Sequence, residues 1–505
     1  MSSFLVAVLL FLAPSTGEVV LSLKGRSTYG AKLAAVNEVS ERQRGFILDC
    51  FALPDVSHNP GMTPWPDSFS DLQLNKSELT PPYPPVLLAW RPGVYSVAYM
   101  VMSSGPTRQH WKQVKGVDFL ENHVINKMNQ LQRNRFYLPS DPRLVHIPSN
   151  ANSSSGNATT LRLVYAALFK SQHFKMAFND LRYTQIKQPR SWASALYAEA
   201  PVNHLSLEAE TGPAVPQKNW APFFYQQQQS ANSSGGGGVL LYVHSILPQH
   251  RILLHPPSIN TNTSTNTSTN TSTNTSTGTG TTSTNHSSPA KVAWLWGWHV
   301  RTVPVQTVAL TTVTSTATAT ATATANTAAT ATATASATAA AQDGGPLWEW
   351  GSPRGGSPPL LLASTPFGPR YLAFFHSSGE FLAQRVRTYF MGAYLFDARP
   401  PFGISHFSRE PIVPLGFYAE NVSGWTYKKL DYCIFPTGAV LLPAAQSGAG
   451  GAGAGGEGVV AVSLGRNDAK GMVMLLNLTR AFFLEHLRPV AAKEDINRFP
   501  LPGSL

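Results

Sequence analysis

A series of short aromatic segments between Trp350 and Asp468 constrains the fold of this chain more than any other feature. Each segment is a run of aromatic and aliphatic residues closed by Gly, Pro or Ser, as in Tyr371 to His376, Tyr389 to Asp397, Ile434 to Gly438 and Val462 to Asp468. Such runs are typical of β-strands that alternate with tight turns. Polar and charged residues stand at the segment ends, where a sheet can hold several of them around one cleft. The pattern predicts an all-β fold.

Two low-complexity tracts interrupt the chain. Residues 257–290 repeat the unit Asn-Thr-Ser-Thr, and residues 310–342 alternate Ala with Thr. Neither tract has large apolar side chains, so burial cannot offset the entropy lost on ordering its backbone. We therefore expect disordered insertions in loops. Without them, further strands follow one another closely: 161–168, 239–243 and 292–298. Helical periodicity is convincing mainly at 119–133 and 480–490.

Many short strands with long insertions confined to turns predict one domain of repeated sheets, over residues 85–490. Residues 18–84 would be an N-terminal extension with the first strands, and residues 491–505 a C-terminal tail. Residues 1–17 are typical of a signal peptide, because an apolar run precedes Pro and small residues and is too short to span a bilayer. The positively charged residues that usually begin a signal peptide are missing. Residues 1–17 could therefore also be a buried first strand, or the gene model could have a misplaced start.

A signal peptide would place the protein in the secretory pathway, in the ER or Golgi lumen, or outside the cell. Sequons for N-glycosylation agree with that location, although several arise from the composition of the repeats. They stand at Asn75, Asn152, Asn157, Asn232, Asn262, Asn266, Asn270, Asn274, Asn285, Asn421 and Asn477. No other run is long enough for a transmembrane helix, so we expect no stable membrane span.

Charge and cysteine content narrow the possible partners. The net charge of +11 comes with only 13% charged residues, so it reflects few acids rather than a basic block, and no nucleic-acid partner is expected. The two cysteines, Cys50 and Cys433, could form one disulfide or remain two buried thiols. The histidines are scattered, which predicts no metal site, and no glycine-rich nucleotide loop follows a strand.

The first candidate site residues lie in two segments. Asp141 precedes Pro142, which restricts it to an extended backbone and fixes its approach, and Arg143 could pair with a phosphate or a sugar carboxylate. Lys218, Asn219 and Trp220 together suit a carbohydrate, which needs a flat apolar face and polar groups for its hydroxyls. An ordinary Asp-Pro turn and a core tryptophan are the structural alternatives.

The remaining candidates lie in the C-terminal half. Arg354 precedes Gly355-Gly356, whose exposed backbone N–H groups suit an anion such as phosphate. His376 ends an aromatic strand, and Asp468 is a strand-end carboxylate that could bind a sugar hydroxyl. A plain glycine turn, a structural histidine and a turn cap are the corresponding alternatives.

The order of these segments resembles glycoside hydrolase family 130, five-bladed β-propellers that act on β-mannosides. The segments that carry the resemblance are, in order, Asp141-Pro142-Arg143, Lys218-Asn219-Trp220, Gly355-Gly356 before Phe375-His376, Tyr389 to Asp397, Ser408 to Ile412, Ile434 to Gly438, and Gly465 to Asp468. The likeness spans residues 85–480 without the inserts. The chain departs from the family pattern at Ser140, Phe375 and Arg466-Asn467.

The resemblance implies a five-bladed β-propeller with long low-complexity loop insertions and an inverting reaction at a β-linked mannosyl residue. Asp141 matches the general acid, which would need a raised pKa in a partly dry cleft. Arg143, Lys218, Asn219, Trp220, Arg354, His376, Tyr389 and Asp468 become candidates for contacts with substrate or phosphate. No cofactor is implied, and inorganic phosphate would be a co-substrate of a phosphorylase.

The enzyme class stays open between phosphorylase, hydrolase and glycosyltransferase. An oligosaccharide or glycan is the expected partner in each case. A non-catalytic, lectin-like propeller that binds glycans is the main alternative, and a scaffold with glycosylated spacers is another. Neither alternative needs an acid at Asp141.

Overall fold

The computed structural model describes most of the strand-rich sequence. The described residues are 29–66, 79, 83–92, 97–114, 119, 138–148, 160–168, 174–187, 192–198, 202–207, 219–226, 238–246, 250–254, 296–304, 348–383, 386–400, 402–418, 433–443, 458–467 and 469–490. The insert residues 257–290 and 310–342, the proposed signal peptide and the tail 491–505 lie outside these ranges.

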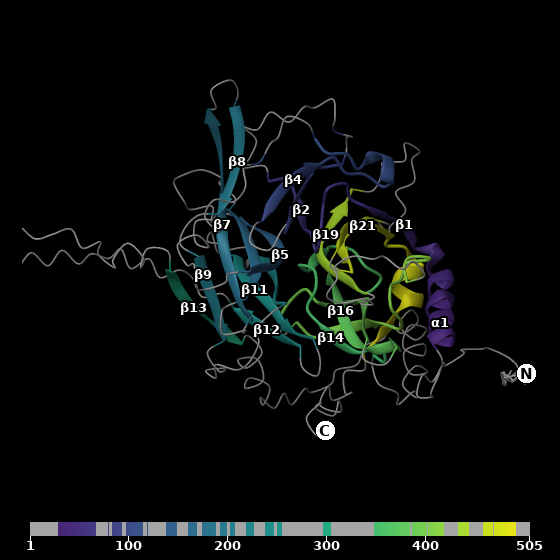
Figure 1. Cartoon of the computed structure of the whole chain (residues 1–505). Coiled ribbons are helices and arrows are strands. Elements are labelled where there is room, and N and C mark those ends of the chain that lie inside the picture. The colour runs from purple at the N-terminus through teal and green to yellow at the C-terminus, as the bar shows by residue number, and fades with distance from the viewer. Residues whose placement is uncertain are drawn as a thin grey trace, which may run out of the picture.

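Strands form four sheets, and most neighbours within a sheet are antiparallel (Figure 1). The first sheet contains β2 (Gly61–Pro64), β3 (Val86–Trp90) and β4 (Ala98–Met102). The nine-stranded sheet contains β5 (Leu138–Ile147), β6 (Thr160–Leu168), β7 (Phe174–Lys187), β8 (Trp192–Ala198), β9 (Val202–Leu207), β10 (Ala221–Gln226), β11 (Gly238–Ser245), β12 (Arg251–Leu254) and β13 (Trp296–Pro304). Its two halves, β5–β8 and β10–β12, are joined through β9, which pairs with β13 in parallel.

The other two sheets come from the C-terminal half and the N-terminus. The six-stranded sheet contains β14 (Ser352–Arg354), β15 (Leu360–Leu362), β16 (Arg370–Ala383), β17 (Val386–Asp397), β18 (Ile404–Ser408) and β22 (Leu487–Pro489). The four-stranded sheet contains β19 (Ile434–Leu442), β20 (Val459–Arg466), β21 (Lys470–Asn477) and β1 (Ile47–Ala52). Helical segments are α1 (Tyr29–Arg42), the short turns Gln43–Gly45 and Arg108–His110, and the π-helical turn Phe482–His486.

Both faces of the central strands are buried, because each sheet lies between two others. In β20, Val460 and Val462 belong to the core shared with the six-stranded sheet, whereas Ala461 between them faces the core shared with β3 and β4. Side chains alternate between the two faces of a strand, so a strand covered on both sides needs apolar residues at every position. This explains why these strands read as continuous apolar runs rather than as alternating patterns.

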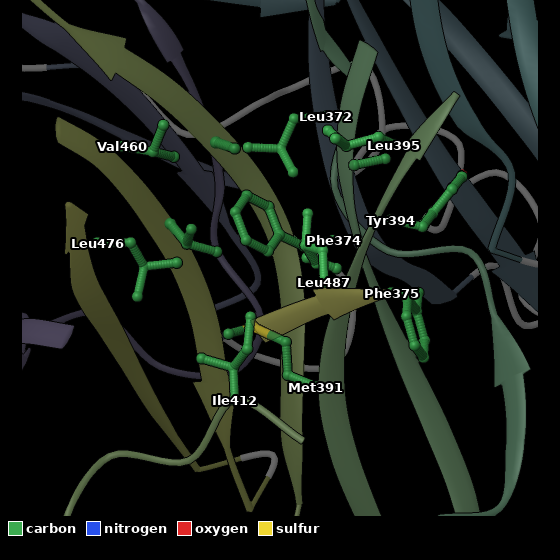
Figure 2. Packing of buried hydrophobic residues seen from close by; sticks show 14 of the residues in the cluster. Leu372, Phe374, Phe375, Met391, Tyr394, Leu395, Ile412, Val460, Leu476 and Leu487 are labelled. Carbon is green, nitrogen blue, oxygen red and sulfur yellow. The ribbon is translucent and has the colours of Figure 1, made fainter. Parts of the chain in front are cut away.

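Four hydrophobic clusters fill the spaces between the strand groups. One lies between β3–β4 and β5–β7, and another between β5–β7 and β10–β12. The largest joins β10–β12, the six-stranded sheet and the β19–β21 sheet, and Figure 2 shows part of it around Phe374, Met391 and Leu476. The fourth lies between the β19–β21 sheet and β2–β4. The last sheet therefore packs against the first.

The N-terminal segment fastens the C-terminal sheets. β1 pairs with β21 in antiparallel register, with Cys50 opposite Met474. The buried side chain of Gln43 donates to the carbonyl of Pro411 and accepts from the N–H of Val413 at 2.9 Å. An exposed ion pair between Arg42 and Glu410 adds a second link at 2.7 Å.

The prediction of an all-β fold is confirmed, and the strands expected at 161–168, 239–243, 371–376, 389–397 and 434–438 are present. The helix expected at 480–490 is wrong in part: residues 480–486 are helical, but Leu487–Pro489 forms a strand because it completes the six-stranded sheet beside β18. Apart from Phe119, the predicted helix at 119–133 lies outside the described residues. No described helix is long and apolar enough to cross a membrane.

The two cysteines are free thiols. The register runs from Cys50 through Met474 and Val462 to Ala439 in β19, six positions after Cys433. Three strand intervals alone separate the two by about 14 Å. A disulfide needs Cα atoms within about 7 Å, so the sheet excludes the bridge. Burial also raises the pKa of the Cys50 thiol to about 12.

Candidate functional site

Asp141 lies at a bulge in β5, not on an extended strand. The register with β6 shifts between Ser140 and Arg143, and Asp141 has a φ of 52°. The expectation that Pro142 holds Asp141 in an extended conformation is therefore wrong. The bulge places an extra residue in the strand, and aspartate is one of the residues that tolerate positive φ. Its half-buried carboxylate is turned toward the segment that precedes β2.

Asn59 contacts this carboxylate directly. Its side-chain amide donates to Asp141 Oδ1 at 2.7 Å, and Asn59 is itself buried. Close backbone approach makes room for it: a Cβ on Gly465 of β20 would lie 1.6 Å from Asn59 Oδ1. On the same segment, the carbonyl of Pro60 accepts hydrogen bonds from the hydroxyls of Thr437 and Ser463. No sequence motif marks Asn59 as a site residue. The sequence feature that points to it is Gly465, where a side chain would collide with Asn59.

His58, beside Asn59, also faces this region. It has a φ of 61°, and burial and the neighbouring charge of Arg91 lower its pKa to about 4, although the charge of Asp141 acts in the opposite direction. The imidazole is therefore neutral near pH 7. A neutral His58 leaves Asp141 without a cationic partner at this position.

Arg143 is fully buried and bonds to backbone. Its Nε donates to the carbonyl of Gly356 at 2.7 Å, and one terminal nitrogen donates to the carbonyl of Asp141 at 2.9 Å. The other terminal nitrogen is buried without a hydrogen bond among the described residues. Burial lowers the pKa of Arg143 to about 10, which still leaves it charged at neutral pH. Its geometry ties the Asp141 bulge to the Gly355-Gly356 turn.

Asn219 meets the same turn from β10. A Cβ on Gly355 would lie 2.1 Å from the carbonyl oxygen of Asn219, which explains the glycine there. Asn219 has a φ of 71° and is buried, and its side-chain oxygen has no hydrogen bond among the described residues. Trp220, however, is only 1% exposed and packs against Tyr242 and His244. It is a core residue, so the expected carbohydrate platform is absent at this position.

His376 connects the Gly355-Gly356 turn to the sheet of β19–β21 and β1. It lies opposite the exposed Arg354 in the pairing of β14 with β16, and its ring stacks near Phe435 at 4.1 Å and Tyr389 at 6.0 Å. The backbone of Tyr389 forms an isolated parallel β-bridge with that of Cys433. His376 is 1% exposed, so its ring is enclosed by aromatic neighbours.

Asn467, which directly follows β20, bonds to Cys433. Its side chain accepts from the N–H of Cys433 at 2.8 Å, and its own N–H donates to the carbonyl of Cys433 at 2.9 Å. We call the resulting set the contact ring. It consists of Asn59, Asp141, Arg143, Asn219, Arg354, Gly355, Gly356, His376, Tyr389, Cys433, Gly465 and Asn467. Every described candidate residue except Trp220 belongs to it. Lys218 and Asp468 lie outside the described residues, next in sequence to Asn219 and Asn467.

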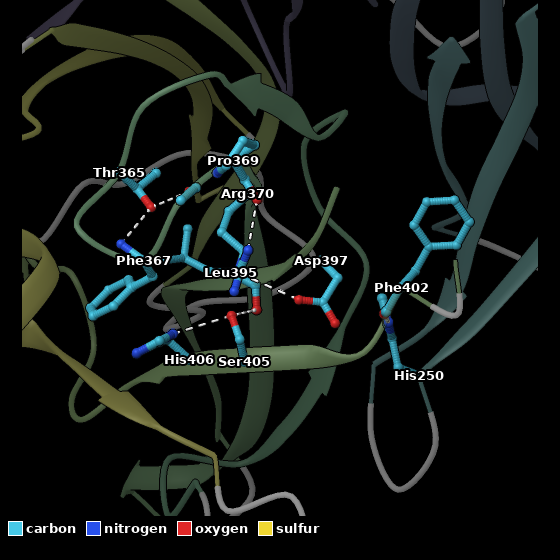
Figure 3. Close-up of polar contacts among 11 residues, drawn as sticks. His250, Thr365, Phe367, Pro369, Arg370, Leu395, Asp397, Phe402, Ser405 and His406 are labelled. Atoms are coloured by element: carbon cyan, nitrogen blue, oxygen red, sulfur yellow. Dashed lines mark hydrogen bonds and ion pairs between the residues drawn. The ribbon is translucent and has the colours of Figure 1, made fainter. Parts of the chain in front are cut away.

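A second polar cluster lies away from the predicted site, where β16, β17 and β18 meet (Figure 3). Arg370 pairs with Asp397 at 3.5 Å, and His406 stacks on Phe367 with ring centres 3.7 Å apart. Ser405 donates to the carbonyl of Leu395 at 3.3 Å. Of these groups, Leu395 and Asp397 belong to the predicted segment Tyr389 to Asp397. Among the described residues, no group of three or more His, Cys, Asp or Glu side chains could hold a metal ion.

Comparisons with known proteins give remote similarities only. No family model matches the sequence, and no curated protein matches it. Among solved structures, the chain is similar to a mannose phosphorylase from Leishmania mexicana in complex with phosphate ion, at a TM-score of 0.33 and 9% identity, covering 90% of this chain and 97% of that one. It is also similar to Trypanosoma rangeli sialidase in complex with sialic acid, at a TM-score of 0.27 and 8% identity, covering 85% and 58%. TM-scores this low assign neither a fold nor an activity.

Proposed function

We propose that this protein is a carbohydrate-active enzyme that acts on β-linked mannosides or related β-glycosides, with Asp141 as its general acid. The observation that carries the proposal is the contact ring. Segments 82 to 408 positions away from Asn59 in the sequence, from Asp141 to Asn467, are linked one to the next by these contacts, and Asn59 bonds directly to the Asp141 carboxylate. They are the segments whose order resembles glycoside hydrolase family 130.

The proposed architecture is a five-bladed β-propeller. Five strand groups would be its blades: β2–β4, β5–β8, β10–β13, β14–β18 with β22, and β19–β21 with β1. The hydrophobic clusters support this, because each group packs against the next and the last packs against the first. β2 also lies against both β5 and β19, and β10 lies against β5, as expected for the innermost strands of neighbouring blades. The long inserts would then lie in loops.

Asp141 is suited to proton transfer by its surroundings. Asn59 fixes Oδ1 through one hydrogen bond, so the orientation of the carboxyl group is set while Oδ2 remains for a leaving-group oxygen. Arg143 acts through the backbone: its two bonds hold the bulge and the Gly355-Gly356 turn together. We therefore propose it as a positioning residue in place of the anion contact expected from the sequence.

The reaction would proceed with inversion at the anomeric carbon. Asp141 gives its proton to the glycosidic oxygen as that bond breaks, and phosphate attacks the opposite face of the sugar; in a hydrolase, water would attack there and a second carboxylate would take its proton. With phosphate, a single carboxylic acid suffices, because the nucleophile is already anionic. Arg354 is exposed and opposite His376, which places a cation at the rim of the contact ring. We propose it, with Lys218, for contact with phosphate or substrate.

The test compares wild type with Asp141→Asn on a panel of β-mannosides, with and without phosphate, following mannose 1-phosphate and free mannose. Asp55→Asn is the control, because Asp55 is an exposed aspartate that also has positive φ. Phosphate-dependent release that is lost in Asp141→Asn but kept in Asp55→Asn would identify a phosphorylase, and phosphate-independent release a hydrolase. Release that survives Asp141→Asn would refute the assigned acid. Glycan binding without turnover by wild type would favour the lectin-like alternative.

We further propose a location in the secretory pathway, on the basis of the sequons and the N-terminal apolar run. Peptide mapping of the protein purified from the lysate and from the medium of expressing eukaryotic cells, before and after treatment with an N-glycosidase, tests it. Unmodified sequons together with an intact residue 1 in the product would contradict this location.

A further inference from the structure

We propose that a pocket that shares no residue with the contact ring binds small organic acids, with Arg108 as the anion contact. The pocket has a volume of about 360 Å³ and lies where the end of β1 meets the turn after β4. It is lined by Phe51, Ala52, Leu53, Pro54, Arg108 and Trp111. None of these residues belongs to the motifs that suggested the function. A volume of this size is in the range of small-molecule sites.

The floor of the pocket is apolar and rigid. Phe51 and Trp111 are buried, with ring centres 6.1 Å apart. The Trp111 Nε1–H already donates to the carbonyl of Gly105 at 2.8 Å, so the indole offers a ligand only carbon surface. Leu53 is fixed by its N–H bond to the carbonyl of Gly471 at 2.9 Å. The floor therefore suits a flat or aliphatic group rather than a polar one.

The rim carries one exposed cation. The guanidinium of Arg108 lies over the Phe51 ring at 5.8 Å, and no carboxylate of the described residues forms an ion pair with it. The turn that presents Arg108 is held in place, because Trp111 and His110 donate their N–H groups to the carbonyls of Arg108 and Thr107. An arginine in this setting offers a planar fork of donors that matches a carboxylate.

An apolar floor beside a single arginine selects a monocarboxylic acid with an apolar body. The carboxylate would bond to Arg108 while the body covers Phe51, Leu53 and Trp111. Because Phe51 lies in β1, Leu53 follows β1 and Trp111 follows β4, such a ligand would contact both the last sheet and the first. A ligand that binds only the folded state raises its stability. Binding here should therefore resist separation of these two sheets.

The test uses benzoate as the probe and benzyl alcohol, of similar shape but uncharged, as the ligand control. Binding to the full chain is measured by ligand-observed NMR titration and by the shift of the thermal unfolding midpoint. Arg108→Gln removes the cation, and Ala52→Phe fills the pocket from β1 without changing charge. Arg480→Gln is the matched control, since Arg480 is another exposed arginine and does not line the pocket. Circular dichroism verifies that each variant is folded.

We expect saturable benzoate binding that weakens about tenfold in Arg108→Gln and in Ala52→Phe and is unchanged in Arg480→Gln. Benzyl alcohol should bind wild type and Arg108→Gln equally. Benzoate that does not bind wild type, or that binds Arg108→Gln within twofold of wild type, overturns the proposal. If Arg108→Gln does not fold, Ala52→Phe decides: undiminished binding in it places benzoate elsewhere and refutes the site.

Discussion

Asn59 donates its side-chain amide to Asp141 Oδ1 at 2.7 Å, although the two residues lie 82 positions apart. The bond depends on a third segment, since the space that Asn59 occupies exists because Gly465 has no side chain. Three distant parts of the chain thus determine how one carboxylate is oriented. Activity should therefore respond when any of the three is changed.

Gly465→Ala should destabilise the protein strongly. The added Cβ would lie 1.6 Å from Asn59 Oδ1, and strand β20 cannot shift without disturbing both of its neighbours. We expect a loss of about 2–4 kcal/mol in the free energy of unfolding, at the upper end of overpacking effects. Urea unfolding measures it. Gly45→Ala is the control, because a Cβ at Gly45 meets nothing within 4 Å; equal effects at both positions would contradict the contact.

Asn59→Ala should reduce catalysis more than stability. The carboxyl group of Asp141 loses the donor that orients it; the group becomes charged as it gives up its proton, and a hydrogen bond to the charged form is worth about 1.5–3 kcal/mol. We expect kcat on the substrate identified for wild type to fall about tenfold to a hundredfold, with KM nearly unchanged. Asn37→Ala, on helix α1, serves as the control. An unchanged kcat in folded Asn59→Ala would separate this hydrogen bond from the chemistry.

Arg143→Lys should fail to replace arginine. A lysine ammonium is a point charge and cannot span the carbonyls of Asp141 and Gly356 as the guanidinium does. Loss of these buried bonds should cost about 3–5 kcal/mol of unfolding free energy. If Arg143 instead bound substrate phosphate, KM for phosphate would rise in a variant of normal stability. Unfolding and phosphate kinetics on the same preparation distinguish the two roles.

His250 should make the fold sensitive to acid. Its Nδ1 bonds to the carbonyl of Phe402 at 2.9 Å, and burial lowers its pKa to about 4. An unfolded histidine has a pKa near 6.5, so between these values only the unfolded chain binds the proton. Stability is therefore complete above about pH 6.5 and falls as pH drops toward 4, by on the order of 3 kcal/mol from this residue.

The variant that checks the acid effect is His250→Gln, which keeps an amide donor but does not titrate. Its unfolding free energy should depend less on pH between 6.5 and 4.5 than that of wild type, whatever its stability at pH 7.5. His58 and His486, whose pKa values burial lowers to about 4 and about 3, leave part of the slope in place. Identical slopes in the two proteins would refute the assignment to His250.

Substitutions of two neighbouring residues at the end of α1 should differ sharply in how much they lower the stability of the protein. Arg42→Ala removes an exposed ion pair with Glu410, which is worth about 0.2–1 kcal/mol. Gln43→Ala leaves the carbonyl of Pro411 and the N–H of Val413 without their partner in a buried place, and each orphan costs about 1–3 kcal/mol. The midpoint temperature of thermal unfolding should be much lower for Gln43→Ala than for Arg42→Ala. The opposite order would contradict the described docking of α1.

Sequence patterns revealed the strands more readily than the site. Segments such as Tyr371 to His376 could be predicted because strands buried on both faces are continuously apolar. Helix α1 could not be predicted, because its helical pattern is weak and the contacts of Arg42 and the following Gln43, with Glu410 and Pro411, are with residues 368 positions away.

The site residues show the same limit. Asp141 and Arg143 could be selected from their motif, but the role of Arg143 depends on Gly356, 213 positions away. The positive φ of Asp141 follows from a bulge that no local pattern marks. Trp220 could not be distinguished from a ligand platform, because burial by Tyr242 and His244 is a property of the assembled sheets.

The pairing of β1 with β21 has a consequence for synthesis on the ribosome. Ile47 is opposite Leu476, so the strand made first must wait for a partner made 429 residues later. At about 5–20 residues per second, the wait is about 20–90 seconds. Through that interval β1 carries unpaired backbone groups, and such an edge can recruit strands from another nascent chain. The protein is therefore most exposed to misassembly while it is still being made, and a chaperone that covers residues 47–52 would protect it during that time.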